Sequence, residues 1–435
     1  MKTLSNVKAA SLGLQHVLAM YTGAAIVPLI VGSAIGLSGE ELAYLVAIDL
    51  FMCGVATLLQ VFVTKYTGVG LPVVLGCTFT AVGPMIAIGS LQGITAIYGA
   101  LIASGLIIFV ISGWFSRIAI LFPPVVLGSV VTIIGISLIP AAINDIGGGQ
   151  GAKDFGDMRY LALAGLTIVL ILVFNRYGTV FSKAAAVLIA VLIGTLVAFG
   201  MGMIDFSPVA EASWFQMVTP FYFGVPTFNA TAILTMTLVG LVSMVESTGV
   251  FLTLGEITDK KLTDKDLARG YRAEGAATII GGIFNSFPYT TYSQNVGLVQ
   301  LTGVKTRKVI VFAGFFLIVL GFLPKVATFT TLIPKPVLGG AMLVMFGTVA
   351  ASGIRILSRV DFAKNDNVIT VALALGVGLG ISMNPAIVAS LPDQVRVLTD
   401  SPIVAGSVTA LLLNGLFRLT EKKTTTRKLP LAKVE

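Results

Sequence analysis

The sequence predicts an all-α polytopic membrane protein whose fourteen transmembrane segments form two inverted seven-segment repeats. Three observations support this prediction. Hydrophobic residues make up 56% of the 435 residues and charged residues only 11%, whereas soluble domains average about 25% charged residues. Uncharged apolar runs of about 20 residues, the length that crosses a bilayer core, recur along the chain. The positive charges and a weak internal repeat are distributed as this topology requires, and mean hydropathy is +0.97.

Hydropathy places the segments one after another along the whole chain. The first contains His16 and precedes many further spans, so we expect a retained helix rather than a cleaved signal peptide. The predicted segments are 9–33, 43–64, 71–88, 93–113, 119–140, 160–176, 184–203, 230–254, 273–286, 288–304, 308–323, 333–352, 367–384 and 402–418.

The distribution of positive charge orients these segments. With the N-terminus inside, all but five of the 28 Lys and Arg residues lie on the cytoplasmic side, the exceptions being Lys153, Arg159, Lys325, Lys335 and Arg396. Such a bias predicts a multi-pass cell-membrane protein with both termini in the cytoplasm. The net charge of +8 then reflects topology and attraction to anionic lipid headgroups, and it requires no nucleic-acid partner.

A weak internal repeat relates the two halves of the chain. The stretch FPPVVLGSVVTIIG (122–135) resembles IPKPVLGGAMLVMFG (333–347), and Pro72 and Pro288 each open a polar, interrupted segment. Seven is an odd number, so the second repeat must be inserted upside down, as in many secondary transporters. Irregular backbone is tolerated at membrane depth only inside protein or beside a water-filled cavity. We therefore predict short extended stretches in segments 3 and 10, facing each other at the midplane, the second leading into a half-helix at about Asn295.

Intramembrane ionisable groups are costly and are candidates for function. The predicted spans contain three acidic residues, Asp49, Glu246 and Glu274, and the single histidine, His16. Glu246 lies in mid-segment, where it could accept two N–H groups of a planar heterocycle and hold or release a proton, or else form a structural hydrogen bond.

The other three ionisable residues have structural readings that compete with a functional one. Glu274 suits either proton coupling or the first turn of a helix, where the helix dipole favours an acid. Asp49 fits a structural role better. His16 is either a satisfied polar residue or a group that orients the site through a hydrogen bond.

Three further residues of the broken segments are candidates for contacts with a solute. The Gln294 carboxamide offers one donor group and one acceptor, which match an adjacent N–H and C=O on a base. It could instead cap the following half-helix, although Asn295 is the better capping residue. Phe79 could stack on a planar ligand or simply pack.

Other functional classes lack the residues they need. One histidine excludes an H-E-x-x-H metalloprotease, and the sequence has no P-loop or dinucleotide fingerprint. Cys53 and Cys77 lie in apolar segments and suit packing, so we expect no metal, no cofactor and no enzymatic activity. An anion exchanger or channel would need a cation facing the midplane, yet every Lys and Arg lies outside the predicted spans.

At these residues the chain resembles the nucleobase–ascorbate transporters, also called nucleobase:cation symporter family 2. The tenth-segment signature of the purine branch is present, with Thr306 in place of the usual Ser; its residues are Gln294, Asn295, Gly297, Thr302, Gly303 and Arg307. The stretches QHVLAMYTGAAIVPLIVG (15–32) and LPVVLGCTFTAVGPM (71–85) and Glu246 are also similar, whereas Glu274 stands where Asp is usual and Val250 where many relatives are polar. The likeness spans residues 10 to 420 and is greatest to bacterial xanthine permeases, with uric acid permeases next.

The resemblance implies a core domain (9–113 and 230–323), a gate domain (119–203 and 333–418) and a basic cytoplasmic tail (419–435). It implies proton-coupled uptake of an oxopurine, xanthine or alternatively uric acid, by a homodimer joined through its gate domains. Glu246 and Gln294 would hold the base, assisted by backbone groups near Phe79 and Ser293.

Overall fold

The computed structural model describes residues 4–119, 123–149, 151–391, 399 and 401–425. Its helices and strands form two compact units, Met1–Leu121 with Leu138–Gly347, and Phe122–Ser137 with Thr348–Glu435. Arg396 and residues 426–435 of the predicted tail lie outside the described residues.

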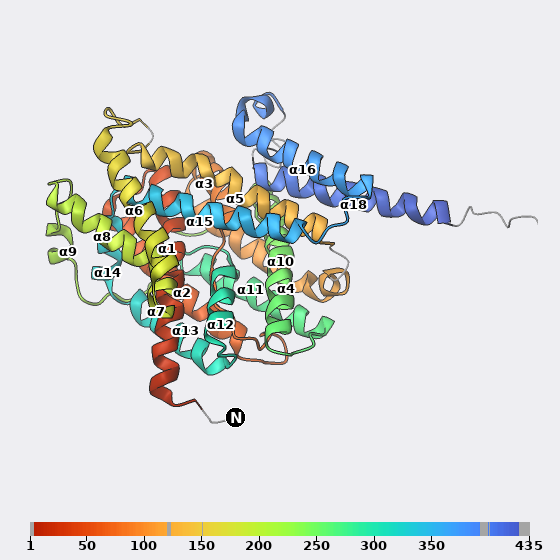
Figure 1. The fold of residues 1–435 in the computed structure, drawn as a ribbon, viewed down its shortest axis with the longest axis horizontal. Helices are drawn as coiled ribbons and strands as arrows, with labels where there is room; N and C mark the ends of the chain where they lie inside the picture. The colour runs from red at the N-terminus through yellow and green to blue at the C-terminus, as the bar shows by residue number, and fades with distance from the viewer. Residues whose placement is uncertain (1–3, 120–122, 150, 392–398, 400, 426–435) are drawn as a thin grey trace, which may run out of the picture. The chain divides into compact units, whose positions relative to one another are not determined.

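Long helices from both halves of the sequence pack in pairs in the first unit (Figure 1). Helix α4 (Ile94–Ala119) packs along α11 (Asp264–Ile283) and α10 (Ala230–Ile257), and α2 (Gly39–Val61) packs along α13 (Arg307–Gly321) and α1 (Asn6–Ala34). Glycines permit a close crossing of α4 and α11, since a Cβ added to Gly105 would lie 2.9 Å from the Gly275 carbonyl oxygen, and one added to Gly275 would lie 2.9 Å from the Gly105 carbonyl oxygen. Small residues at such crossings are typical of helix pairs in membranes.

The remaining helices are distributed over both units. The first unit also contains α6 (Met158–Tyr177), α7 (Val180–Ala184), α8 (Ala186–Gly200), α9 (Ser207–Glu211) and α14 (Pro324–Thr331). Helices α5 (Pro124–Ile146) and α15 (Lys335–Leu357) run through both units. The second unit contains α16 (Asn365–Met383), η2 (Pro385–Val388) and α18 (Pro402–Thr425), and there α16 packs against α18.

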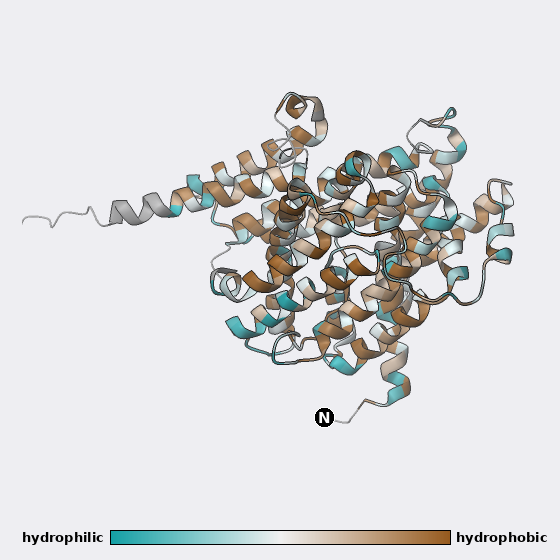
Figure 2. Cartoon of the chain, turned by 180° about the vertical axis from the view of Figure 1, so that it is seen from behind, coloured by the Kyte–Doolittle hydropathy of each residue, from teal (hydrophilic) through white to brown (hydrophobic). Residues whose placement is uncertain are grey.

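The apolar character of the helices confirms a helical polytopic membrane protein. Among the described residues, eight helices are long and apolar enough to span a bilayer, or nine if α13 and α14, which are bent by 80°, form one span. Hydrophobic residues cover most of the helices, whereas hydrophilic residues gather at helix ends and in connections (Figure 2). Each predicted hydrophobic segment coincides with at least one helix.

Segments 3 and 10 are broken, as the sequence predicts. Strand β1 (Leu75–Cys77) pairs antiparallel with β2 (Tyr289–Thr291), with Gly76 opposite Thr290. A short 3₁₀ helix η1 (Phe79–Ala81) and helix α3 (Val82–Gln92) follow β1, and helix α12 (Ser293–Thr302) follows β2. The two extended stretches therefore face each other and satisfy each other's backbone groups inside the bundle.

Two local predictions are wrong. Helix α11 begins at Asp264, well before the predicted start of segment 9, because a capping box between Thr263 and Asp266 extends it through polar residues that hydropathy does not count. Glu274 is therefore in mid-helix and not in a first turn. Helix α12 begins at Ser293 with Tyr292 as its N-cap and no side-chain cap, so neither Gln294 nor Asn295 caps it.

Candidate functional site

The strand pair leads into two helix N-termini with free backbone donors. The first N–H groups of a helix have no partner within that helix. Among the described residues, no hydrogen-bond partner is present for the backbone N–H groups of Phe79, Ser293 and Gln294. Such groups, with the positive end of the helix dipole behind them, suit an acceptor on a bound solute.

Glu246 and Gln294 supply polar side chains beside these donors. Helix α10, which carries Glu246, packs against η1, β2 and α12. Both side chains are half-buried, and neither forms a hydrogen bond or ion pair within the described part of the chain. Since buried polar groups in native proteins are normally hydrogen-bonded, two unpaired groups on adjoining elements indicate a place for an external ligand.

Phe79 is buried and makes aromatic contacts. Its ring stacks on that of Tyr292, with ring centroids 6.4 Å apart and planes inclined by 16°, and it meets Phe346 edge-on at 5.4 Å. The Tyr292 hydroxyl donates to the Cys77 carbonyl oxygen at 3.0 Å. Phe79 therefore packs against both the strand pair and α15, and its ring forms one apolar side of the region around the free donors.

Asn295 and His16 form one unit. The Asn295 side-chain amide lies 3.1 Å from His16 Nδ1 and donates to the His16 carbonyl oxygen, also at 3.1 Å, while its Oδ1 has no partner among the described residues. Both residues are buried. This contact ties α12 to α1 just beyond Gln294, so it positions the first turn of α12.

Glu274 belongs to a hydrogen-bonded network that reaches the second strand. The Ser247 hydroxyl donates to Glu274 Oε1 at 2.6 Å, and it lies 3.0 Å from the Thr290 hydroxyl and 3.1 Å from the Thr291 hydroxyl. Ser247 directly follows Glu246 in α10, so the network reaches the residue next to that acid. The sequence prediction missed Ser247; its place beside an intramembrane acid was the available signal.

Asp49 supports the strand pair from the other side. Fully buried on α2, it accepts hydrogen bonds from the Ser286 and Tyr289 hydroxyls, each at 3.0 Å, and from the Cys53 thiol at 3.6 Å. Ser286 and Tyr289 also bond to each other. With three donors around it, Asp49 is a structural anchor for β2, a role whose partners could not be predicted from local sequence.

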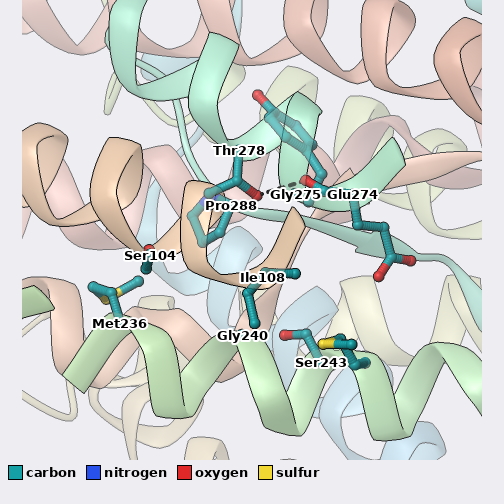
Figure 3. A pocket seen from close by; sticks show the side chains of 12 residues that line it. Ser104, Ile108, Met236, Gly240, Ser243, Glu274, Gly275, Thr278 and Pro288 are labelled. Carbon is teal, nitrogen blue, oxygen red and sulfur yellow. Dashed lines mark hydrogen bonds between the residues drawn. The ribbon is translucent and has the colours of Figure 1, made fainter. Parts of the chain in front are cut away.

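A small cavity adjoins Glu274 (Figure 3). Its volume is about 20 Å³, and Ser104 of α4, Ser243 of α10 and Thr278 of α11 line it together with Glu274. The Ser243 hydroxyl has no hydrogen-bond partner among the described residues. The cavity is large enough for one water molecule, which would satisfy this hydroxyl, and it is too small for a planar ring system.

The site offers no arrangement for a metal ion. Across the described ranges, no group of three or more His, Cys, Asp or Glu side chains could hold one. The polar groups around the strand pair are carboxyl, carboxamide, hydroxyl and backbone N–H, which suit reversible hydrogen bonding to a neutral polar solute.

Comparison with known sequences places the chain among transporters. Residues 7–387 match the model of a permease family, Xan_ur_permease. The chain is 56% identical to the nucleobase transporter PlUacP of Paenibacillus larvae over 96% of each chain. It is 55% identical to the xanthine permease of Bacillus subtilis over 95% of each chain, and 54% identical to the uric acid permease PucK of that organism over 94% of this chain and 95% of PucK.

Solved structures share the fold at low sequence identity. The transmembrane domain of the cyanobacterial bicarbonate transporter BicA superposes with a TM-score of 0.62 at 15% identity, covering 93% of this chain and 97% of that one. Murine Slc26a9, an anion transporter in an inward-facing state, gives a TM-score of 0.68 at 11% identity, covering 97% of this chain and 69% of that one. The family match across most of the sequence confirms the resemblance to nucleobase transporters: the chain belongs to the permease family Xan_ur_permease and is a multi-pass membrane transporter rather than an enzyme.

Proposed function

We propose that the protein imports an oxopurine, xanthine in first place, by proton symport. The observation that carries this proposal is the pair of unpaired polar side chains, Glu246 and Gln294, beside free helix N-terminal donors in a chain 55% identical to a xanthine permease. Fixed ring N–H and C=O groups are what such a set of acceptors and donors recognises.

In the proposed complex the Glu246 carboxylate accepts two ring N–H groups of the purine, and the Gln294 carboxamide pairs with an adjacent N–H and C=O. The backbone N–H groups of Phe79 and Ser293 donate to a purine carbonyl, and Phe79 packs on the ring. Asn295, held by His16, positions Gln294. Each contact is weak alone, but leaving one unpaired in a closed site is costly, which gives selectivity.

Proton coupling is assigned to the two glutamates. A carboxylate away from water is costly without a partner, so the empty site favours a neutral Glu246. Purine N–H groups favour the carboxylate instead, so substrate binding and the protonation of Glu246 are linked, and the proton leaves Glu246 for a neighbouring group within the protein. Glu274 accepts a hydrogen bond of 2.6 Å from the hydroxyl of Ser247, the residue that follows Glu246. Glu274 is therefore the neighbouring group to which a proton can pass, while Asp49 supports the site.

We extend the proposal to the wider architecture that the sequence predicts. We propose fourteen spans in two inverted repeats, forming a core domain (9–113 and 230–323) and a gate domain (119–203 and 333–418). Both termini, including the basic tail 419–435, lie in the cytoplasm, and two copies associate through the gate domains. The bias of positive charge supports the orientation.

Two alternative functions, transport of uric acid and anion exchange, have support of their own. Uric acid is the alternative oxopurine, because PucK, a uric acid permease, is 54% identical to this chain. Anion exchange is the alternative on the same fold, since BicA is a bicarbonate transporter and Slc26a9 is an anion transporter. Against anion exchange, no Lys or Arg forms an ion pair with Glu246 in the described part of the chain.

Uptake of radiolabelled xanthine by cells that lack their own purine carriers tests the proposal. We expect accumulation against a gradient that a protonophore abolishes, and competition by unlabelled oxopurines but not by bicarbonate or sulfate. Stronger competition by uric acid than by xanthine would reassign the substrate, and inhibition by inorganic anions alone would overturn the proposal.

Gln294→Glu should change selectivity. The substitution replaces an amide donor by a carboxyl group that can donate only when protonated, so one purine acceptor loses its partner. We expect xanthine uptake to fall by about tenfold or more and the inhibition pattern among purines to shift. Gln300→Glu, the same change at an exposed position of α12, is the control. An unchanged inhibition profile in Gln294→Glu would remove Gln294 from the site.

Ser293→Cys should report occupancy of the site. Ser293 is exposed, whereas the native Cys53 and Cys77 are both buried, so a small maleimide should label the variant well above background. We expect xanthine to slow this labelling severalfold. Gln300→Cys, on the same helix, should react equally with and without xanthine. Labelling of Ser293→Cys at the same rate with and without xanthine would contradict a site at the start of α12.

A further inference from the structure

Three cationic side chains converge at one end of the first unit, where several connections meet. Lys260 follows α10, Arg269 lies in α11, and Arg307 begins α13. Lys260 Nζ and Arg307 Nη1 lie 3.4 and 3.5 Å from a single point, the position a Cβ would take on Gly70. The Arg269 carbonyl oxygen accepts a hydrogen bond from the neighbouring Gly68 N–H at 3.1 Å.

The positive charge of this cluster is only partly neutralised. Within the part of the chain that the structure describes, Asp266 is its one acidic partner, with Oδ1 2.5 Å from Arg269 Nη2 and 3.8 Å from Lys260 Nζ. Burial lowers the pKa of Lys260, and Arg269 and Arg307 lower it further, against the opposite effect of Asp266. Three cations facing one carboxylate at short range leave an unbalanced charge, which an anion would relieve.

Donors also remain free. Lys260 Nζ donates to the Val69 carbonyl oxygen at 2.7 Å, and Arg307 Nη1 donates to the Val61 carbonyl oxygen at 3.3 Å. Arg269 Nε is buried without a partner, and Arg307 Nε and Nη2 have none among the described residues. The side chains are accessible, since that of Lys260 is 35% exposed and that of Arg269 is 26% exposed. Guanidinium groups with unused N–H donors are suited to phosphate oxygens.

We propose that Lys260, Arg269 and Arg307 form a binding site for a phosphate group, separate from the transport site. The group is supplied by an anionic phospholipid or by soluble phosphate; the chemistry of recognition is the same. Bound there, it would join the end of α2, the connection at Gly70, the second turn of α11 and the first turn of α13, and so stabilise this end of the bundle. Basic clusters of this kind at the membrane surface bind anionic headgroups.

Thermal unfolding of the purified full-length protein in neutral detergent tests this site. The probes are phosphatidylglycerol against phosphatidylcholine, and potassium phosphate against chloride at equal ionic strength. The test variant is Arg307→Gln, with Lys260→Gln as a second in case the first fails to fold. The matched control is Lys305→Gln, which removes a nearby cation that is already paired with Asp259 at 2.9 Å.

We expect phosphatidylglycerol to raise the unfolding midpoint of the wild type more than phosphatidylcholine does. The phosphatidylglycerol concentration that gives half of the full stabilisation should rise by about tenfold in Arg307→Gln and Lys260→Gln, the usual loss for one charged hydrogen bond. It should stay unchanged in Lys305→Gln. Stabilisation by phosphate as well as phosphatidylglycerol, lost in the same variants, identifies soluble phosphate as a source. Equal stabilisation by phosphatidylcholine, or an equal loss in Lys305→Gln, would overturn the proposal.

Discussion

Glu246→Gln should reduce concentrative xanthine uptake to near background while the protein still reaches the membrane. The substitution keeps the size of the side chain but fixes it as neutral, and its NH₂ group faces the N–H donors of the purine. The lost interaction is a charged hydrogen bond, and the remaining donors are left unpaired, so we expect uptake to fall by at least about tenfold. Glu256→Gln, on the same helix at an exposed position, should transport normally.

Active uptake across a pH gradient, compared with xanthine binding by the purified protein, separates binding from coupling. If Glu246→Gln still accumulates xanthine and a protonophore still abolishes the accumulation, Glu246 is not the coupling residue. Glu274 would then take that role, because it is the acid that accepts the hydrogen bond of the Ser247 hydroxyl.

The strand pair shows what local sequence can predict in this fold. In a plain lipid-facing helix, the polar side chains of the β-branched run after Pro288 would lack hydrogen-bond partners. The counterpart of this run after Pro72 has the same character. Their pairing follows from the need to satisfy backbone groups at membrane depth, and the register of Leu75 with Thr291 confirms it. The order of the elements and the apolar helices were also predictable from local sequence, since both depend on composition within short windows.

The partners of the buried acids were not predictable, because they depend on contacts between distant segments. Asp49 bonds to Ser286 and Tyr289, which are 237 and 240 residues away in sequence. His16 and Asn295 are 279 residues apart. Helix propensity favours Asn295 as a cap of its own helix, yet tertiary contact turns its side chain toward α1. Periodicity carries no information of this kind.

Hydropathy also misjudged the polar helix end. It detects the apolar part of α11 but not the turns from Asp264 onward, whose start is set by the hydrogen bonds of Thr263 and Asp266. The capping box was present in the sequence and would have moved the predicted start. With that start, Glu274 lies in mid-helix and not in a first turn.

Gly76→Ala should abolish transport and lower the stability of the protein. A Cβ on Gly76 would lie 2.5 Å from Cζ and 2.6 Å from Cε1 of the Tyr292 ring, closer than non-bonded carbon atoms approach. The ring cannot retreat freely, because it stacks on Phe79 and its hydroxyl bonds to the Cys77 carbonyl oxygen. Overpacking of this kind costs about 1–3 kcal/mol, and here the strain falls on the strand pair that carries both half-helices.

The control is Gly83→Ala in α3, where an added Cβ would meet nothing within 4 Å; a helical Gly→Ala change there should be neutral or stabilising by up to about 1 kcal/mol. The measurements are the thermal unfolding midpoint in detergent and xanthine uptake normalised to protein in the membrane. If Gly76→Ala matched Gly83→Ala in both, the strands could spread without penalty, and the close packing of Tyr292 on β1 would not be what holds the free donors of Phe79 and Ser293 in place.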